Sequence, residues 1–135
     1  MEKTMLILCD GMRPDSIEAC LNPYAKSFAQ QSLVAMQGQT IMPSVTLPCI
    51  MSLFTSAMPQ NHGIFTLQYA APLTPIQGLF EQVTTQGAKC AMFYTWEELR
   101  DLAKPGSLAF SACVSEVHAP CSACDAKAVE LAIEF

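Results

Sequence analysis

Short apolar runs bounded by turn residues alternate along this chain with segments whose apolar residues recur at helical spacing. The run at residues 4–10 predicts a buried parallel strand, and residues 88–95 and 107–115 predict further strands. Residues 33–41 predict a further strand or an extended crossing. The helical spacing predicts helices over residues 17–32 with a break near Pro23, from near Thr46 to Met58, and over 76–87, 96–104 and 124–135; Pro105 and Gly106 stop the fourth of these.

Strands that alternate with helices predict an α/β fold, in which a parallel sheet is flanked by helices on both faces. A length of 135 residues fits one domain, residues 1–135, with a buried core. The last helical segment still runs at Phe135, where no Gly, Asn or Pro stops it. We therefore expect the chain to end inside a structural element and its sheet to be incomplete at the C-terminus.

Composition argues against several classes of protein. A net charge of −5 and a pI near 4.8 argue against binding nucleic-acid polymers, which requires basic surface. The run MLILC is too short to span a membrane or to form the core of a signal peptide. Seven cysteines are an odd number for a disulfide framework. We expect a cytoplasmic protein with reduced thiols and no membrane partner.

Two positions combine a suitable side chain with a suitable place in the predicted elements. Asp10 ends the first predicted strand, where ligand sites of α/β sheets gather, and its carboxylate is a hard ligand for a divalent metal. Thr46 lies near a helix N-terminus, where backbone N–H groups and the helix dipole attract an anion such as phosphate. The alternatives are that Thr46 or Ser44 only caps the helix and that Asp10 only forms a turn.

The stretches "LILCDGMRPDSI" and "MPSVTLPCIMSLFTSAMPQNHGI" carry a family resemblance. Together they resemble the N-terminal part of the type I phosphodiesterase and nucleotide pyrophosphatase family, in the alkaline phosphatase superfamily. The segments "GLFEQ" and "FYTWEELRDLAKPGS" also look like bacterial members, so the resemblance covers essentially the whole chain. It implies an alkaline phosphatase-like fold and a hydrolase acting on small phosphate esters.

The resemblance also implies roles for individual residues. Thr46, in "TLP", corresponds to the nucleophile that forms a phospho-threonine intermediate, and it is a metal ligand together with Asp10. His62, in "PQNHGI", corresponds to a loop-organising residue rather than a ligand. Such sites hold two divalent metal ions, usually zinc.

Some departures from the family pattern bear on activity. Leu67 occupies the position where members commonly carry a phosphate-contacting Asn, and Cys49 stands where Asn often follows the TLP turn. Two zinc ions need about six to eight ligands, yet the chain has only two histidines, His62 and His118. We expect an N-terminal fragment that is inactive alone and binds no metal, or one ion weakly.

Other interpretations stay open on the sequence. His118, Cys121 and Cys124 have metal-like spacing, which fits a non-enzymatic metal or thiol-redox module. Arg13 follows Asp10 closely enough to meet a phosphate, although an ion pair with Asp15 is an alternative. The chain could also be an assembly domain. If part of a larger protein is missing, exposed apolar surface predicts self-association.

Overall fold

The computed structural model describes residues 3–72, 75–115 and 120–135. The chain divides into two compact units, Met1–Gln39 and Thr40–Phe135. Unit 1 and unit 2 are these two segments, and each is described by itself. The prediction of one domain over residues 1–135 stays a prediction.

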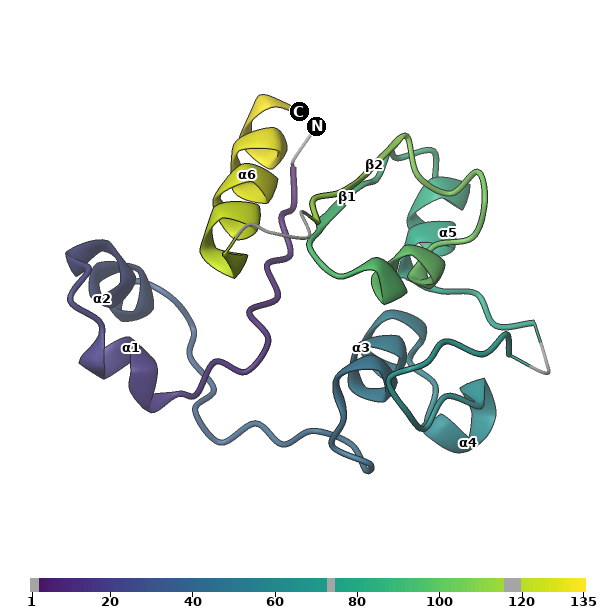
Figure 1. Cartoon of the computed structure of the whole chain (residues 1–135), viewed down its shortest axis with the longest axis horizontal. Helices are drawn as coiled ribbons and strands as arrows, with labels where there is room; N and C mark the ends of the chain where they lie inside the picture. The colour runs from purple at the N-terminus through teal and green to yellow at the C-terminus, as the bar shows by residue number, and fades with distance from the viewer. Residues whose placement is uncertain (1–2, 73–74, 116–119) are drawn as a thin grey trace. The chain divides into compact units, whose positions relative to one another are not determined.

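Unit 1 contains two short helices that pack against each other, α1 (Asp15–Ala19) and α2 (Pro23–Gln30) (Figure 1). The predicted break near Pro23 is confirmed. Asn22 adopts an extended conformation, and its side-chain oxygen accepts the Tyr24 N–H at 2.9 Å. An Asn cap followed by proline at the first helical position is a favourable helix start, because proline lacks a donor that would have no partner there.

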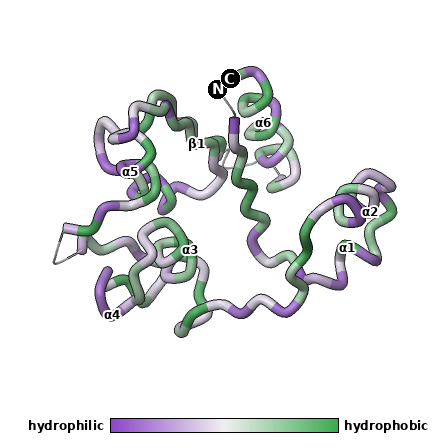
Figure 2. Tube along the Cα trace, turned by 180° about the vertical axis from the view of Figure 1, so that it is seen from behind, coloured by the Kyte–Doolittle hydropathy of each residue, from purple (hydrophilic) through white to green (hydrophobic). Residues whose placement is uncertain are grey.

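The buried strand predicted at residues 4–10 is wrong. This segment has no strand hydrogen bonds in the described structure, and Met5, Leu6, Ile7 and Leu8 are 46–71% exposed. Figure 2 shows the hydrophobic character of the chain just after the N-terminus. Residues 33–41 also form no strand and contain a turn, so the strand predicted there is wrong and the extended crossing stays a prediction. A strand needs a hydrogen-bonded neighbour, and hydropathy alone does not provide one.

Unit 2 begins its regular structure with α3 (Thr46–Thr55), followed by α4 (Pro59–His62). The helix predicted to reach Met58 stops at Thr55, because Ser56 adopts a left-handed conformation with φ 54°. The Thr55 hydroxyl donates to the Met51 carbonyl at 2.7 Å and accepts the Ala57 N–H at 3.3 Å. These bonds close the turn between the two helices.

The sheet of unit 2 is a parallel pair, β1 (Ala91–Tyr94) and β2 (Phe110–Cys113), in which Ala91 lies opposite Phe110. The predicted strands at 88–95 and 107–115 and their parallel pairing are therefore confirmed. Helix α6 (Cys121–Glu134) packs against β1, and the rings of Phe93, Phe110 and Phe135 lie 5.5–6.1 Å apart. The chain has α/β character, and a larger sheet covered on both faces stays a prediction.

The core of unit 2 forms where α3 packs against α5 (Leu79–Thr85) and the 3-10 helix η1 (Glu97–Leu102). Leu47, Met51 and Phe54 recur at helical spacing and put one face of α3 into this core. The other buried members are Ile64, Phe80 and Leu102. The rings of Phe54 and Phe80 stack with centroids 5.0 Å apart. This apolar face fixes α3 within unit 2.

Glu81 joins the start of α5 to the segment after η1. Its carboxylate accepts the Gly78 N–H at 2.6 Å and the Lys104 N–H at 2.9 Å. Burial alone raises the pKa of Glu81, but the hydrogen bonds from Lys104, Gly78 and Ser107 outweigh burial and lower the pKa below its usual value. The ionised carboxylate therefore contributes to the folded structure.

Candidate functional site

The predicted helix start at Thr46 is confirmed. Val45 is extended and occupies the N-cap position, Thr46 is the first helical residue, and the Cys49 N–H donates to the Val45 carbonyl at 3.1 Å. Before the helix, the Val45 N–H donates to the Pro43 carbonyl at 2.8 Å. Thr46 is half-buried. The helix thus presents a hydroxyl at its first position rather than at its cap.

The first turn of α3 has features that favour an anion. No acidic side chain lies in this turn, and the leading N–H groups of a helix point along the axis with the positive end of its dipole. Pro48 is buried in the same turn, where its fixed φ suits a helix start and its missing N–H removes one donor. Cys49, one turn on, places its Sγ 3.7 Å from the Pro43 carbonyl oxygen. That contact holds the chain before the helix against its first turn.

His62 is fully buried at the end of α4 and bonds in two directions. Its Nδ1 accepts the Ile64 N–H at 3.1 Å, and its Nε2 lies 3.0 Å from the Ser52 Oγ in α3. Because Nδ1 accepts a backbone N–H, the neutral ring carries its proton on Nε2, and this N–H donates a hydrogen bond to the Ser52 hydroxyl oxygen. Burial lowers the pKa of His62, which favours this neutral form. His62 thereby ties α3 to the chain after α4, and its loop-organising role stays a prediction.

Asp10 and Arg13 both lie in the exposed turn before α1. The Asp10 carboxylate accepts the Gly11 N–H at 3.0 Å, and Gly11 has a φ of 70°, which glycine adopts without strain. Arg13 forms a bidentate ion pair with Asp15, with N–O distances of 3.0 and 2.9 Å. The pair raises the pKa of Arg13 and lowers that of Asp15. A phosphate-binding role for Arg13 stays a prediction.

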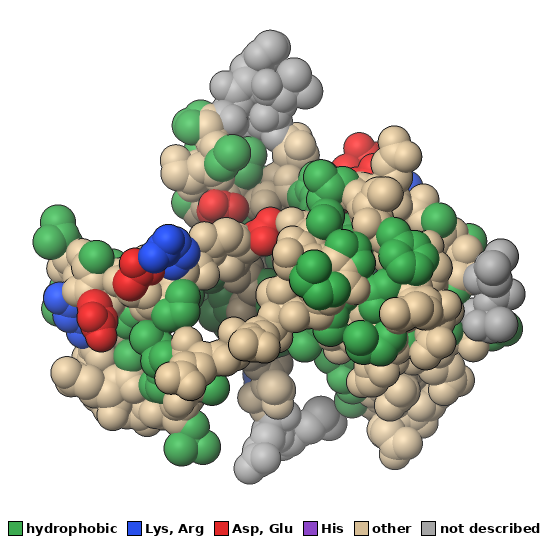
Figure 3. Space-filling view, turned by 90° about the horizontal axis from the view of Figure 1, so that it is seen from below, with side chains coloured by type: hydrophobic (Ala, Val, Ile, Leu, Met, Phe, Trp, Pro, Cys, Tyr) green, Lys and Arg blue, Asp and Glu red, His purple; other side chains and the backbone are tan. Residues whose placement is uncertain are grey.

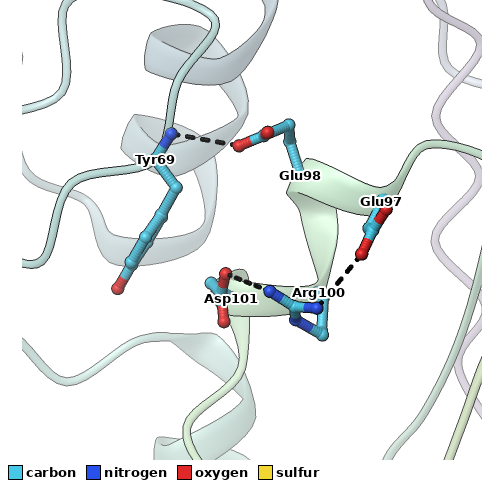
Figure 4. Close-up of polar contacts among 5 residues, drawn as sticks. All are labelled: Tyr69, Glu97, Glu98, Arg100 and Asp101. Atoms are coloured by element: carbon cyan, nitrogen blue, oxygen red, sulfur yellow. Dashed lines mark hydrogen bonds and ion pairs between the residues drawn. The ribbon is translucent and has the colours of Figure 1, made fainter.

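The Leu67 side chain is 51% exposed and lies in a bend after α4. Beside it, the Thr66 hydroxyl accepts the Gln68 N–H at 3.2 Å, and the Tyr69 N–H donates to Glu98 of η1 at 3.1 Å (Figure 4). Burial and the nearby Asp101 carboxylate raise the pKa of Tyr69. Leu67 therefore lies on a loop anchored to η1, and its correspondence to a phosphate-contacting position stays a prediction.

The candidate residues fall into two groups. Asp10 and Arg13 belong to unit 1, whereas Thr46, His62 and Leu67 belong to unit 2. The part of the chain that the structure describes holds no group of three or more His, Cys, Asp or Glu side chains placed to bind a metal. The donors present in the described ranges do not fit a two-metal centre.

The alternative metal or redox site is only partly within the described residues. His118 lies outside them, whereas Cys121 and Cys124 both lie in the first turn of α6. Cys121 is exposed and Cys124 is buried, and all seven cysteines are free thiols. The proposed trio stays a prediction.

Sequence reasoning missed Ser52. A serine inside an apolar helix has no motif of its own, and its partner His62 belongs to another helix. The polar residue in the middle of "CIMSLFT" was the only available indication, because it interrupts an otherwise apolar segment.

A comparison with protein families now identifies the class of this chain. The family model described as type I phosphodiesterase / nucleotide pyrophosphatase matches residues 4–105, from the segment before α1 to the end of η1 and just beyond. The chain belongs to this family of hydrolases. Neither a curated protein nor a solved structure matches the chain at a significant level. In the described ranges, no helix has both the length and the apolar character that crossing a membrane requires.

Proposed function

We propose that this chain carries the nucleophile of a phosphodiesterase or nucleotide pyrophosphatase, and that Thr46 is that nucleophile. The observation that carries the proposal is the family match over residues 4–105, with Thr46 at the first position of a helix that buries one face in the core of unit 2. A hydroxyl at that place lies beside the helix end that attracts a phosphoryl group.

The reaction is two successive displacements at phosphorus. The Thr46 oxygen forms a bond to phosphorus, the bond from phosphorus to the leaving alcohol breaks, and the hydroxyl proton ends on that alcohol. Water then forms a bond to phosphorus, the bond to Thr46 breaks, and one water proton restores the Thr46 hydroxyl. The intermediate is a phospho-threonine, and the substrate is a small phosphate ester.

The proposed site also binds metal. We assign Asp10 and Thr46 as ligands of two divalent ions, zinc by preference, as in the family. Because two zinc ions need about six to eight ligands and the sequence has two histidines, we propose that further ligands come from outside these 135 residues. The chain alone is then inactive and binds no ion, or one weakly, and its fold is an alkaline phosphatase-like sheet completed elsewhere.

Composition and surface support the proposed cytoplasmic location and self-association. The odd number of cysteines supports a reducing compartment, the cytoplasm. Many large hydrophobic side chains are exposed, and Figure 3 shows hydrophobic groups open on the surface in that view. Such surface supports self-association of the chain.

The test uses the product of the natural gene, whose intact mass and zinc content are measured first. Turnover of a p-nitrophenyl phosphodiester is then compared among wild type, Thr46→Val and Thr85→Val. Thr85 is the matched control, because its hydroxyl donates only to Gln82 within its own exposed helix turn. We expect metal-dependent turnover and a covalent adduct on Thr46, both lost in Thr46→Val alone. Activity that survives in Thr46→Val, or a product with neither metal nor turnover, would overturn the proposal.

A further inference from the structure

A chain of hydrogen bonds links α3 to the segment after α4. The Ile64 N–H donates to Nδ1 of His62, and the protonated Nε2 donates to the Ser52 hydroxyl oxygen. His62 and Ile64 are buried, with exposures of 0% and 1%. The two bonds therefore form in surroundings where water competes little for them.

A serine 3.0 Å from a histidine is also the geometry of a nucleophile and its general base. The hydrogen bond from Ile64 excludes that role for this tautomer. Nδ1 is occupied as an acceptor, so Nε2 carries the proton and has no lone pair to take one from Ser52. The pair is therefore a fixed contact between two elements.

The Ser52–His62 hydrogen bond restricts rotation of α3 more than its apolar core contacts do. Leu47, Met51 and Phe54 hold one face of the helix by apolar contacts, which are not directional and permit small rotations. A hydrogen bond depends steeply on angle and distance. Ser52 is bonded to a buried partner outside α3, so it restricts rotation of the helix about its axis.

We propose that Ser52 is a positioning residue for Thr46, because its bond to His62 sets the rotation of α3 and with it the direction of the Thr46 hydroxyl. The proposal rests on the nucleophilic role of Thr46 proposed above. The two residues are six positions apart on a ten-residue helix, a rise of about 9 Å. Because the helix is so short, a rotation at Ser52 also rotates Thr46 at its first position.

The experiment compares the natural gene product with Ser52→Ala, Ser52→Thr and Leu53→Ala. Ser52→Thr keeps a hydroxyl, and Leu53 is an exposed neighbour in the same helix. The first measurement is amide hydrogen exchange at Cys49, whose N–H bonds to Val45 in the first turn of α3, and at Gln82, whose N–H bonds to Gly78 at the start of α5. The second is the rate of adduct formation on Thr46, together with KM.

We expect Ser52→Ala to speed exchange at Cys49 but not at Gln82. We also expect it to slow adduct formation on the order of tenfold to a hundredfold with KM little changed. Ser52→Thr should show wild-type exchange at Cys49 and a wild-type rate of adduct formation, and Leu53→Ala should resemble wild type in both measurements. Unchanged exchange at Cys49 in Ser52→Ala, or equal acceleration at Cys49 and Gln82, would overturn the proposal. If wild type forms no adduct on Thr46, the proposed function fails, whereas exchange still decides whether Ser52 holds the helix start.

Discussion

Units 1 and 2 have similar apolar sequence patterns but different packing. In unit 2, the core residues of α3, α5 and η1 are 0–8% exposed. In unit 1, no residue in the described range 3–39 is buried, and Phe28 of α2 is 75% exposed. The difference teaches that an apolar pattern marks residues that can be buried, while burial itself requires neighbouring elements. Unit 1 relies on local bonds such as the Asn22 cap and the Arg13–Asp15 pair.

The largest difference in stability should be between alanine substitutions of two phenylalanines, one in each unit. Phe54→Ala removes a ring that stacks on Phe80 in the core of unit 2, and we expect it to lower the free energy of unfolding by about 3–5 kcal/mol. Phe28→Ala removes an exposed ring of unit 1 and should change it by less than about 0.5 kcal/mol. Urea unfolding of both variants checks this prediction. Similar losses in the two variants would mean that unit 1 buries Phe28 in solution.

A smaller difference in stability should be seen between alanine substitutions of two glycines, one in each unit. A Cβ on Gly78 would lie 2.9 Å from the Glu81 carboxylate, so Gly78→Ala displaces the group that bonds to the Gly78 and Lys104 N–H groups. We expect a loss of about 1–2 kcal/mol in the free energy of unfolding. Gly38→Ala in unit 1 is the control, because its nearest neighbour lies 4.0 Å away. Thermal unfolding at neutral pH gives both values, and equal stability of the two variants would contradict the role of Glu81.

The smallest effect concerns pH. Burial lowers the pKa of His62 below its usual value of 6.5, so the folded state favours the neutral ring. Above about pH 6.5 the ring is neutral in both states and its contribution is fully present. As pH falls below that value, the unfolded chain takes up the proton first, and stability decreases until the pH has passed the folded pKa. Glu81 adds a similar loss only at lower pH, below its usual 4.5.

The measurement is the free energy of unfolding in urea between pH 7.5 and 5. We expect His62→Gln to flatten the dependence on pH across this range. A wild-type slope in His62→Gln would assign the pH dependence to other groups.

Local features of the sequence predicted local structure well. Pro23 marks the break between α1 and α2, Pro48 marks the first turn of α3, and the runs around β1 and β2 became strands. The effect of each of these features is limited to residues a few positions away in the sequence. The family resemblance, carried by motifs around Asp10, Thr46 and His62, was confirmed by the match over residues 4–105.

What the sequence did not predict depends on contacts that residues make outside their own element. Residues 4–10 have the composition of a buried strand, but pairing with a neighbour is not encoded in seven residues. The Ser52–His62 contact joins two helices across a turn that contains Ser56. No hydropathy pattern indicates the left-handed conformation of Ser56. The tautomer of His62 depends in turn on the backbone N–H of Ile64. Such features follow from tertiary packing.

The parallel pairing of β1 and β2 has a consequence for how the chain folds in time. The paired strands are separated by a connection of fifteen residues, 95–109, that contains η1 and is short for a parallel pair. The core of unit 2 also joins Leu47 of α3 to Leu102 and Leu108, which lie far along the chain from it. Parallel pairing and contacts between distant positions form slowly, so we expect unit 2 to fold more slowly than a helical bundle of similar size.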